Sequence, residues 1–162
     1  MDQLAGDAPA AGEQLDTLAA EVARLPPSPD RWGNEIELAY LLDRSGRHDE
    51  AAALYRGTAT ALEGTGYRWL QGHAELGLAE NRAARGDWNG AARHLDAARA
   101  LLPPDLWMTD LRIDVVDMLL AVARGEHETA SAQLLASHAD AHRLGDVPAQ
   151  VALHGLAAPT AR

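Results

Sequence analysis

The sequence predicts an all-α protein built from stacked helical hairpins, because one pattern of small and large residues recurs about every 40 residues. Each copy starts with a glycine, has an alanine five residues later, and has a tyrosine or leucine nine residues later. The glycines are Gly46, Gly86 and Gly125, and a fainter copy starts at Gly6. Glycine can adopt the left-handed conformation that ends a helix, and alanine lets two helix backbones approach closely. No segment shows the alternation of a strand, so we expect about three full antiparallel hairpins with a half-unit at each end.

The expected helices follow one another in pairs along the chain. Residues 1–9 are small and polar and are expected to be frayed, whereas apolar residues at helical spacing predict a helix over 10–25. Pro26 and Pro27 end that helix, and residues 26–31 form a turn or linker. The remaining helices are expected at 33–45 and 48–63, at 67–85 and 88–102, at 106–124 and 127–144, and at 147–156.

The second helix of each hairpin resembles that of the tetratricopeptide repeat. That family has a glycine, a bulky residue two places later and an alanine three places after that, as in GRHDEAAALY from Gly46 and GDWNGAARHL from Gly86. The period is longer than the ~34 residues of the common form, and the family's tryptophan position holds a carboxylate here. Variants of this length resemble the repeat regions of large bacterial transcription activators. The resemblance implies one right-handed α-solenoid over residues 1–162, with first-helix residues lining a concave surface.

Both ends of the predicted solenoid are incomplete. The first helix matches the second half of a repeat without its mate, and the last helix matches a first half alone. Terminal repeats usually carry a polar outer face, but here apolar residues are expected to lack cover, namely Leu15 and Val22 at one end and Val151, Leu153 and Leu156 at the other. The chain is then a piece of a larger protein, or its ends pack against a partner or a second copy, or they cap themselves.

Composition narrows the class of partner. The chain has 162 residues, 24 acidic and 14 basic side chains, and a net charge of −10. Nucleic-acid binding draws its affinity mainly from lysine and arginine, so this balance argues against a nucleic-acid partner. Cysteine is absent, which excludes disulfides and thiolate chemistry. No apolar run is long enough to span a membrane and no signal peptide is visible, so we expect a soluble protein of the cytoplasm.

Three carboxylates occupy equivalent positions in the first helices of the three hairpins: Glu35, Glu75 and Asp114. If these helices stack about 8 to 10 Å apart, the carboxylates form an acidic stripe that Asp117 extends by one turn. One interpretation is a docking surface for a basic peptide, and the alternative is a set of solvated positions in an acidic protein.

The resemblance also implies which residues line the concave surface. Tyr40 and Glu80 fall in one row with Leu119, and His73 and Arg112 fall in another. A tyrosine beside carboxylates can anchor a peptide, although exposed tyrosines without function are equally common. The tryptophans Trp69 and Trp107 could anchor a partner or cover a neighbouring hairpin, and Trp88 is expected to pack.

Motifs for metal binding or catalysis are weak. His138 and His142 share one helical face in HADAH, but Asp140 points to the other side, and His154 could complete a site only if the turn at Gly145 brings it across. No metal or other cofactor is therefore predicted. Phosphate loops and nucleophile motifs are missing. The sequence therefore predicts a non-catalytic module that binds a protein or peptide through its groove or open ends. Self-association through the apolar ends, a sensor or oligomerisation part of a bacterial transcription regulator, and a small enzyme or ligand-binding protein remain alternatives.

Overall fold

The computed structural model describes the backbone of residues 3–103 and 107–143, and the side chains of 12–103, 109–137 and 139. Over these residues the chain forms seven helices and no strand, which confirms the predicted all-α class. The helices are α1 (Gln3–Arg24), α2 (Pro29–Arg44), α3 (His48–Leu62), α4 (Arg68–Ala84), α5 (Trp88–Leu101), α6 (Trp107–Ala123) and α7 (His127–Arg143).

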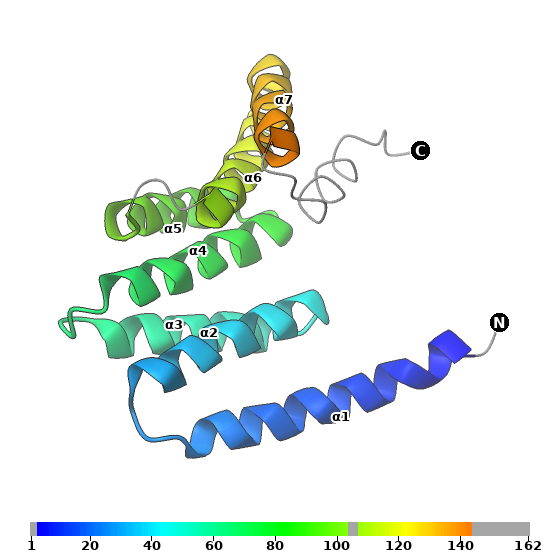
Figure 1. Cartoon of the computed structure of the whole chain (residues 1–162). Coiled ribbons are helices and arrows are strands. Elements are labelled where there is room, and N and C mark those ends of the chain that lie inside the picture. The colour runs from blue at the N-terminus through cyan, green and yellow to red at the C-terminus, as the bar shows by residue number, and fades with distance from the viewer. Residues whose placement is uncertain (1–2, 104–106, 144–162) are drawn as a thin grey trace. The chain divides into compact units, whose positions relative to one another are not determined.

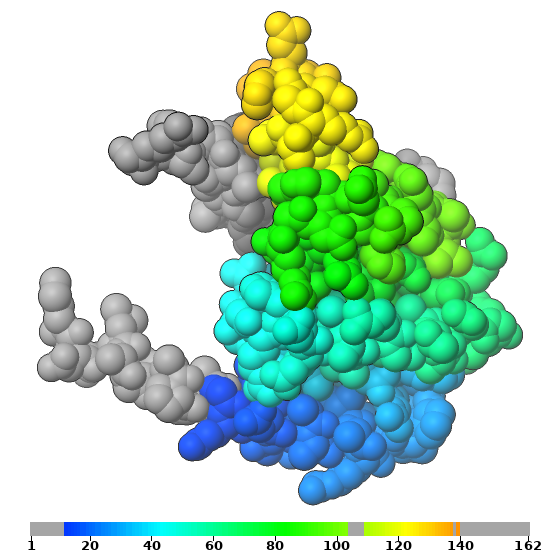
Figure 2. All heavy atoms as spheres, turned by 180° about the vertical axis from the view of Figure 1, so that it is seen from behind, coloured from blue at the N-terminus to red at the C-terminus, as the bar shows by residue number. Residues whose placement is uncertain are grey.

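The chain divides into two compact units, Met1–Pro103 and Pro104–Arg162. In the first unit α1, the α2–α3 hairpin and the α4–α5 hairpin lie one above another (Figure 1). Seen from behind, side chains fill the space between these layers (Figure 2). In the second unit α6 packs along α7. The single solenoid domain over the whole chain stays a prediction.

The turns inside the three hairpins have the same construction. Gly46, Gly86 and Gly125 all have positive φ, at 84°, 74° and 78°. In each turn the amide of the residue after the glycine donates to a carbonyl five residues back, at 2.9 Å. This is the hydrogen bond that closes a helix at a left-handed glycine. The predicted matching bends between paired helices are therefore confirmed.

The alanines that follow these glycines are buried, as the repeat pattern predicts. Ala51 and Ala91 are fully buried, and Ala130 is buried in the second unit. In the first unit the core continues through leucines and alanines of α2, α3 and α4, and Tyr55 of α3 is its largest fully buried side chain. Small residues therefore sit where the helices approach closely, and larger ones fill the space between layers.

Two helices begin earlier than expected. The first starts at Gln3, within the segment expected to be frayed. The second starts at Pro29 and not at residue 33, because the Ser28 hydroxyl accepts a hydrogen bond from the Arg31 amide and proline is favourable in the first turn. The predicted linker over 26–31 is therefore shorter, and its last residues belong to α2.

The expectation that α1 lacks cover is wrong for its inner face. Val22 is only 5% exposed, and Leu15 packs partly buried against the same core. The expected helix over 147–156 and its apolar residues Val151, Leu153 and Leu156 lie outside the described residues. None of the described helices combines the length and the apolar character needed to cross a bilayer.

Candidate functional site

The first member of the predicted acidic stripe, Glu35, lies inside its hairpin. It is 8% exposed, and both carboxylate oxygens are taken up. Arg31 Nε donates to Oε1 at 2.8 Å, and the hydroxyl of Thr58 on α3 donates to Oε2 at 2.9 Å. A buried carboxylate needs such partners to offset its desolvation. Glu35 therefore joins α2 to α3.

The other two carboxylates are held in the same way. His94 Nδ1 on α5 lies 2.7 Å from Glu75 Oε2 on α4, and the Ser137 hydroxyl on α7 donates to Asp114 Oδ2 on α6 at 2.9 Å. Thr58 and Ser137 lie at the same distance in sequence from their hairpin glycines, whereas the second hairpin has Ala98 there. In that hairpin, a histidine one turn earlier contacts the carboxylate instead. We call these three interactions the hairpin clasps.

The clasps change the meaning of the predicted stripe. Each carboxylate contacts a side chain on the second helix of its own hairpin, so its first role is to hold two helices together. Sequence spacing found the equivalent positions but could not show that they face a neighbouring helix. The signal that could have shown it is the polar residue on each second helix. Partner binding by Glu35, Glu75, Asp114 and Asp117 stays a prediction.

The predicted concave residues lie on α2, α4 and α6. Tyr40 is partly exposed on α2, with the Arg44 guanidinium 5.8 Å from its ring centroid. Glu80 is half-buried at the equivalent position of α4, and Arg112 and Asp117 are half-buried on α6 in the second unit. The ring of His73 stands edge-on to Trp69 at 5.8 Å.

The tryptophans differ in their surroundings. Trp69 is 53% exposed, and Trp88 is also exposed although it was expected to pack. Trp32 packs partly buried on the core and lies 5.7 Å from the ring of Tyr67. The side chain of Trp107 lies outside the described residues. Tyr67, which directly precedes α4 and is 39% exposed, therefore adds aromatic surface that the repeat pattern did not single out.

A polar network that sequence reasoning missed joins the second hairpin to the first. The Nδ2 of Asn81 on α4 donates at 2.9 Å both to Asp43 Oδ1 on α2 and to the His48 carbonyl on α3. The Asp43 carboxylate also contacts the His48 ring, and Arg85 pairs with Asp49. Asn81 is fully buried, so this network fixes how one hairpin sits on the next.

A second cluster joins α1 to the first hairpin. Arg47 donates to both oxygens of Glu50, at 2.7 and 2.6 Å, and to Asp16 of α1 at 2.7 Å. These hydrogen bonds, with Glu50 the larger cause and Asp16 the second, raise the pKa of Arg47 above its usual value. The hydrogen bond from Arg47 lowers the pKa of Glu50. The cluster is exposed, and its electrostatic contribution is screened by solvent.

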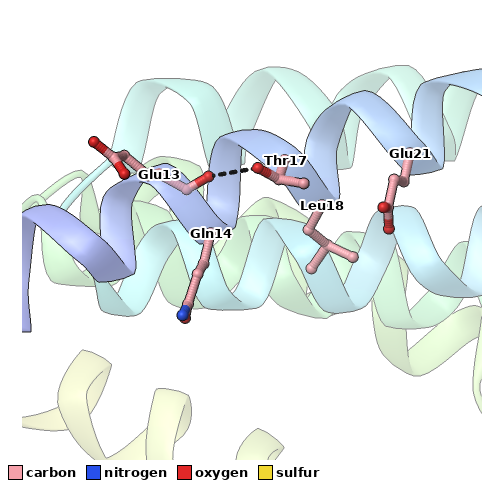
Figure 3. A pocket seen from close by; sticks show the side chains of 5 residues that line it. All are labelled: Glu13, Gln14, Thr17, Leu18 and Glu21. Atoms are coloured by element: carbon pink, nitrogen blue, oxygen red, sulfur yellow. Dashed lines mark hydrogen bonds between the residues drawn. The ribbon is translucent and has the colours of Figure 1, made fainter.

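The surface of α1 is hollowed on two sides of Leu18. One hollow, of about 400 Å³, runs along α1 between Glu13 and Glu21 (Figure 3). In this view Gln14, Leu18 and Glu21 point to the same side of the helix. A second hollow, of about 250 Å³, lies between α1 and α2, and its lining includes Leu18, Glu21, Leu25, Asn34, Glu37 and Leu38. Sequence reasoning expected Leu15 and Val22 to lack cover, but both pack in the core, and the exposed apolar side chain beside these hollows is Leu25, at 38%.

Among the described side chains, no group of three histidine or carboxylate residues is placed to hold a metal ion. The side chains of His138, Asp140 and His142 lie outside that range, as does His154.

This chain matches no family model, no curated protein and no solved structure.

Proposed function

We propose that this chain is a non-catalytic binding module of the tetratricopeptide-repeat type, which holds a protein or peptide partner. The observation that carries the proposal is the threefold recurrence of one hairpin, with positive-φ glycines at Gly46, Gly86 and Gly125 and the same closing hydrogen bond in each turn. Repeats of this kind stack into extended surfaces, and such surfaces serve mainly to bind other macromolecules. On this proposal the hairpins continue as a right-handed solenoid.

The side chains of the described surface favour a protein partner. Exposed aromatic and aliphatic groups, such as Trp69, Tyr40 and Leu25, supply apolar contact area. Carboxylates such as Glu13, Glu21 and Glu37 are exposed as well. This mixture suits a peptide with apolar and basic residues, and the net charge of −10 disfavours nucleic acid. We place the interaction in the cytoplasm, as the composition predicts.

The proposal is tested by capture followed by reconstitution. The intact chain is immobilised, proteins retained from the cytosol of the source organism are identified, and each candidate is purified and titrated against the chain by calorimetry. We expect saturable binding of at least one purified protein with a defined stoichiometry. If no retained protein binds after purification, or if the chain instead converts a small molecule, the proposed function is wrong.

A further inference from the structure

The second helix of each hairpin uses two different stripes of side chains. On α3, Tyr55 faces the next first helix, because a Cβ at Gly77 of α4 would meet the Tyr55 ring at 2.3 Å. Thr58 faces the first helix of its own hairpin, where it bonds Glu35 of α2. His94 on α5 and Ser137 on α7 likewise face their own first helices. One stripe therefore contacts the first helix of the next hairpin, and the other packs against the first helix of its own hairpin.

Helix α1 repeats the sequence spacing of the second helices, although Gly6 lies inside α1 and not at a turn, and no helix precedes α1 among the described residues. Counting from Gly6 as from Gly46, Leu15 corresponds to Tyr55, whereas Gln14 and Leu18 correspond to the positions of the clasp partners. Leu15 packs towards the core, as expected. Gln14 is exposed, whereas Leu18 is partly buried against the same core, and both side chains line the hollow of about 400 Å³ along α1. The solvent side of the stripe that contacts a first helix in the three hairpins is therefore open on α1.

We infer that this open stripe, which consists of Gln14, Leu18, Glu21 and Leu25 and which we call the α1 seat, binds a basic amphipathic helix of a partner protein. The occupant is a helix because the equivalent stripes of α3, α5 and α7 each hold one. It needs an apolar stripe because Leu18 and Leu25 face it, and Leu25 is 38% exposed. The seat extends over about 17 Å, which is about three helical turns.

The charge around the seat selects the partner. Glu13 and Glu21 flank Leu18, and Glu37 of α2 borders the second hollow, while Asp16 is already paired with Arg47. Lysine or arginine on both sides of the partner's apolar stripe would meet these carboxylates. A second copy of the chain fits poorly, because with a net charge of −10 it would bring like charge to an acidic surface. The inference rests on the proposed function and adds to it the surface and the chemistry of the partner.

The test uses the intact chain and designed peptides of about 18 residues, long enough to cover the seat. The first peptide carries leucines at i, i+4, i+7 and i+11 with lysines on both flanks, the second has glutamates in place of the lysines, and the third keeps the lysines but scrambles the leucines. Binding is followed by fluorescence anisotropy at low and high salt. We expect a dissociation constant on the order of micromolar for the first peptide, weaker binding at high salt, and at least tenfold weaker binding of the other two.

Matched protein variants locate the binding. The double variant Glu13→Lys with Glu21→Lys should weaken the first peptide at least tenfold, whereas Glu63→Lys with Asp96→Lys makes the same change of charge at exposed sites elsewhere and should weaken it less than about threefold. Leu18→Gln should weaken it without reversing charge, and circular dichroism shows that each variant remains helical. A photo-reactive amino acid at position 17 should crosslink to the peptide.

Three results would overturn the inference. The glutamate-flanked peptide could bind equally well, the two double variants could weaken binding equally, or the chain could dimerise in a way that Leu18→Gln abolishes, which would make the seat a self-interface. A partner found by capture that binds the Glu13 and Glu21 variant normally would leave the proposed function standing and reject the α1 seat alone. A chain that binds neither a purified protein nor the first peptide would reject the proposed function and the α1 seat together.

Discussion

The joint between α3 and α4 and the joint between α1 and α2 occupy equivalent places in the repeat but are packed differently. At the first joint α4 presents Gly77 and Asn81 to the preceding hairpin, and both are buried. At the second, the corresponding residues of α2 are Glu37 and Leu41; Glu37 is exposed and Leu41 is 41% exposed. Shared turns give both joints a similar chain path, but the side chains between the layers decide how closely they pack. One joint is closed, and the other leaves room for a ligand.

The largest predicted effect comes from filling the space at Gly77. A Cβ there would lie 2.3 Å from the ring of Tyr55, which is itself fully buried and cannot move away freely. Overpacking of this kind costs about 1 to 3 kcal/mol, partly offset by the better helix propensity of alanine. We expect Gly77→Ala to lower the free energy of unfolding by about 2 kcal/mol, measured by urea denaturation.

A matched control separates packing from propensity. Gly57 is also inside a helix, α3, but nothing lies within 4 Å of its Cβ position. Gly57→Ala should therefore stabilise the chain by about 0.5 to 1 kcal/mol. Combining Gly77→Ala with Tyr55→Leu should recover part of the loss, because the clash is removed. If Gly77→Ala stabilises the chain as Gly57→Ala does, the closed joint is described wrongly.

The next effect in size concerns the amide of Asn81. Asn81→Ala removes two hydrogen bonds, one to Asp43 and one to the His48 carbonyl, at a part-buried site. Losing a buried hydrogen-bond partner costs about 1 to 3 kcal/mol. We expect the free energy of unfolding to fall by about 1.5 kcal/mol. The side-chain amide oxygen of Asn81 is itself buried without a hydrogen-bond partner, which reduces what the wild-type residue contributes to stability.

The open joint supplies the comparison for Asn81. Leu41 holds the equivalent position on α2, and because it is partly exposed, Leu41→Ala should cost less than about 1 kcal/mol in the same urea experiment. If Asn81→Ala and Leu41→Ala lower the free energy of unfolding equally, the two joints do not differ in how closely their helices pack. A loss confined to Asn81 would show that the polar network holds the second hairpin on the first.

The hairpin clasps on the two sides of the closed joint should contribute similarly to stability. Removing one of them should lower the free energy of unfolding by less than Asn81→Ala does. Thr58→Val keeps the shape of the side chain and removes its hydrogen bond to Glu35, which still has Arg31 as a partner. We expect a loss of about 1 kcal/mol in the free energy of unfolding. Thr60→Val at an exposed position of α3 is the control and should change stability by less than about 0.5 kcal/mol. If Thr58→Val and Thr60→Val lower the free energy of unfolding equally, the clasp between Thr58 and Glu35 contributes nothing to stability.

The sequence predicted the recurring turns and close helix contacts, and missed which polar side chains meet between the helices. Glycines and alanines at constant spacing were sufficient to place the hairpin turns and the close helix contacts. Glu35 was also placed in an equivalent column, but periodicity does not show whether a column faces water or a neighbouring helix. His94 compensates for Ala98 only in the second hairpin, and Asn81 has no polar counterpart in the others. Such single contacts become visible only when side chains are located in space.

The smallest predicted effect is a pH dependence at the open joint. The folded-state pKa of Glu50 is lowered by Arg47, so the interaction stabilises the fold above the unfolded pKa of about 4.3 and is lost as the pH falls through the lower folded value. The wild-type chain should lose stability as the pH falls from about 6 to 3, and we expect this loss to be slightly smaller in Glu50→Gln. The measurement is the shift of the urea midpoint over the same pH range. Glu63→Gln, at an exposed site away from Arg47, should leave that shift unchanged. An identical pH dependence in the wild type and in Glu50→Gln would show that the interaction of Arg47 with Glu50 contributes nothing measurable to the stability of the fold.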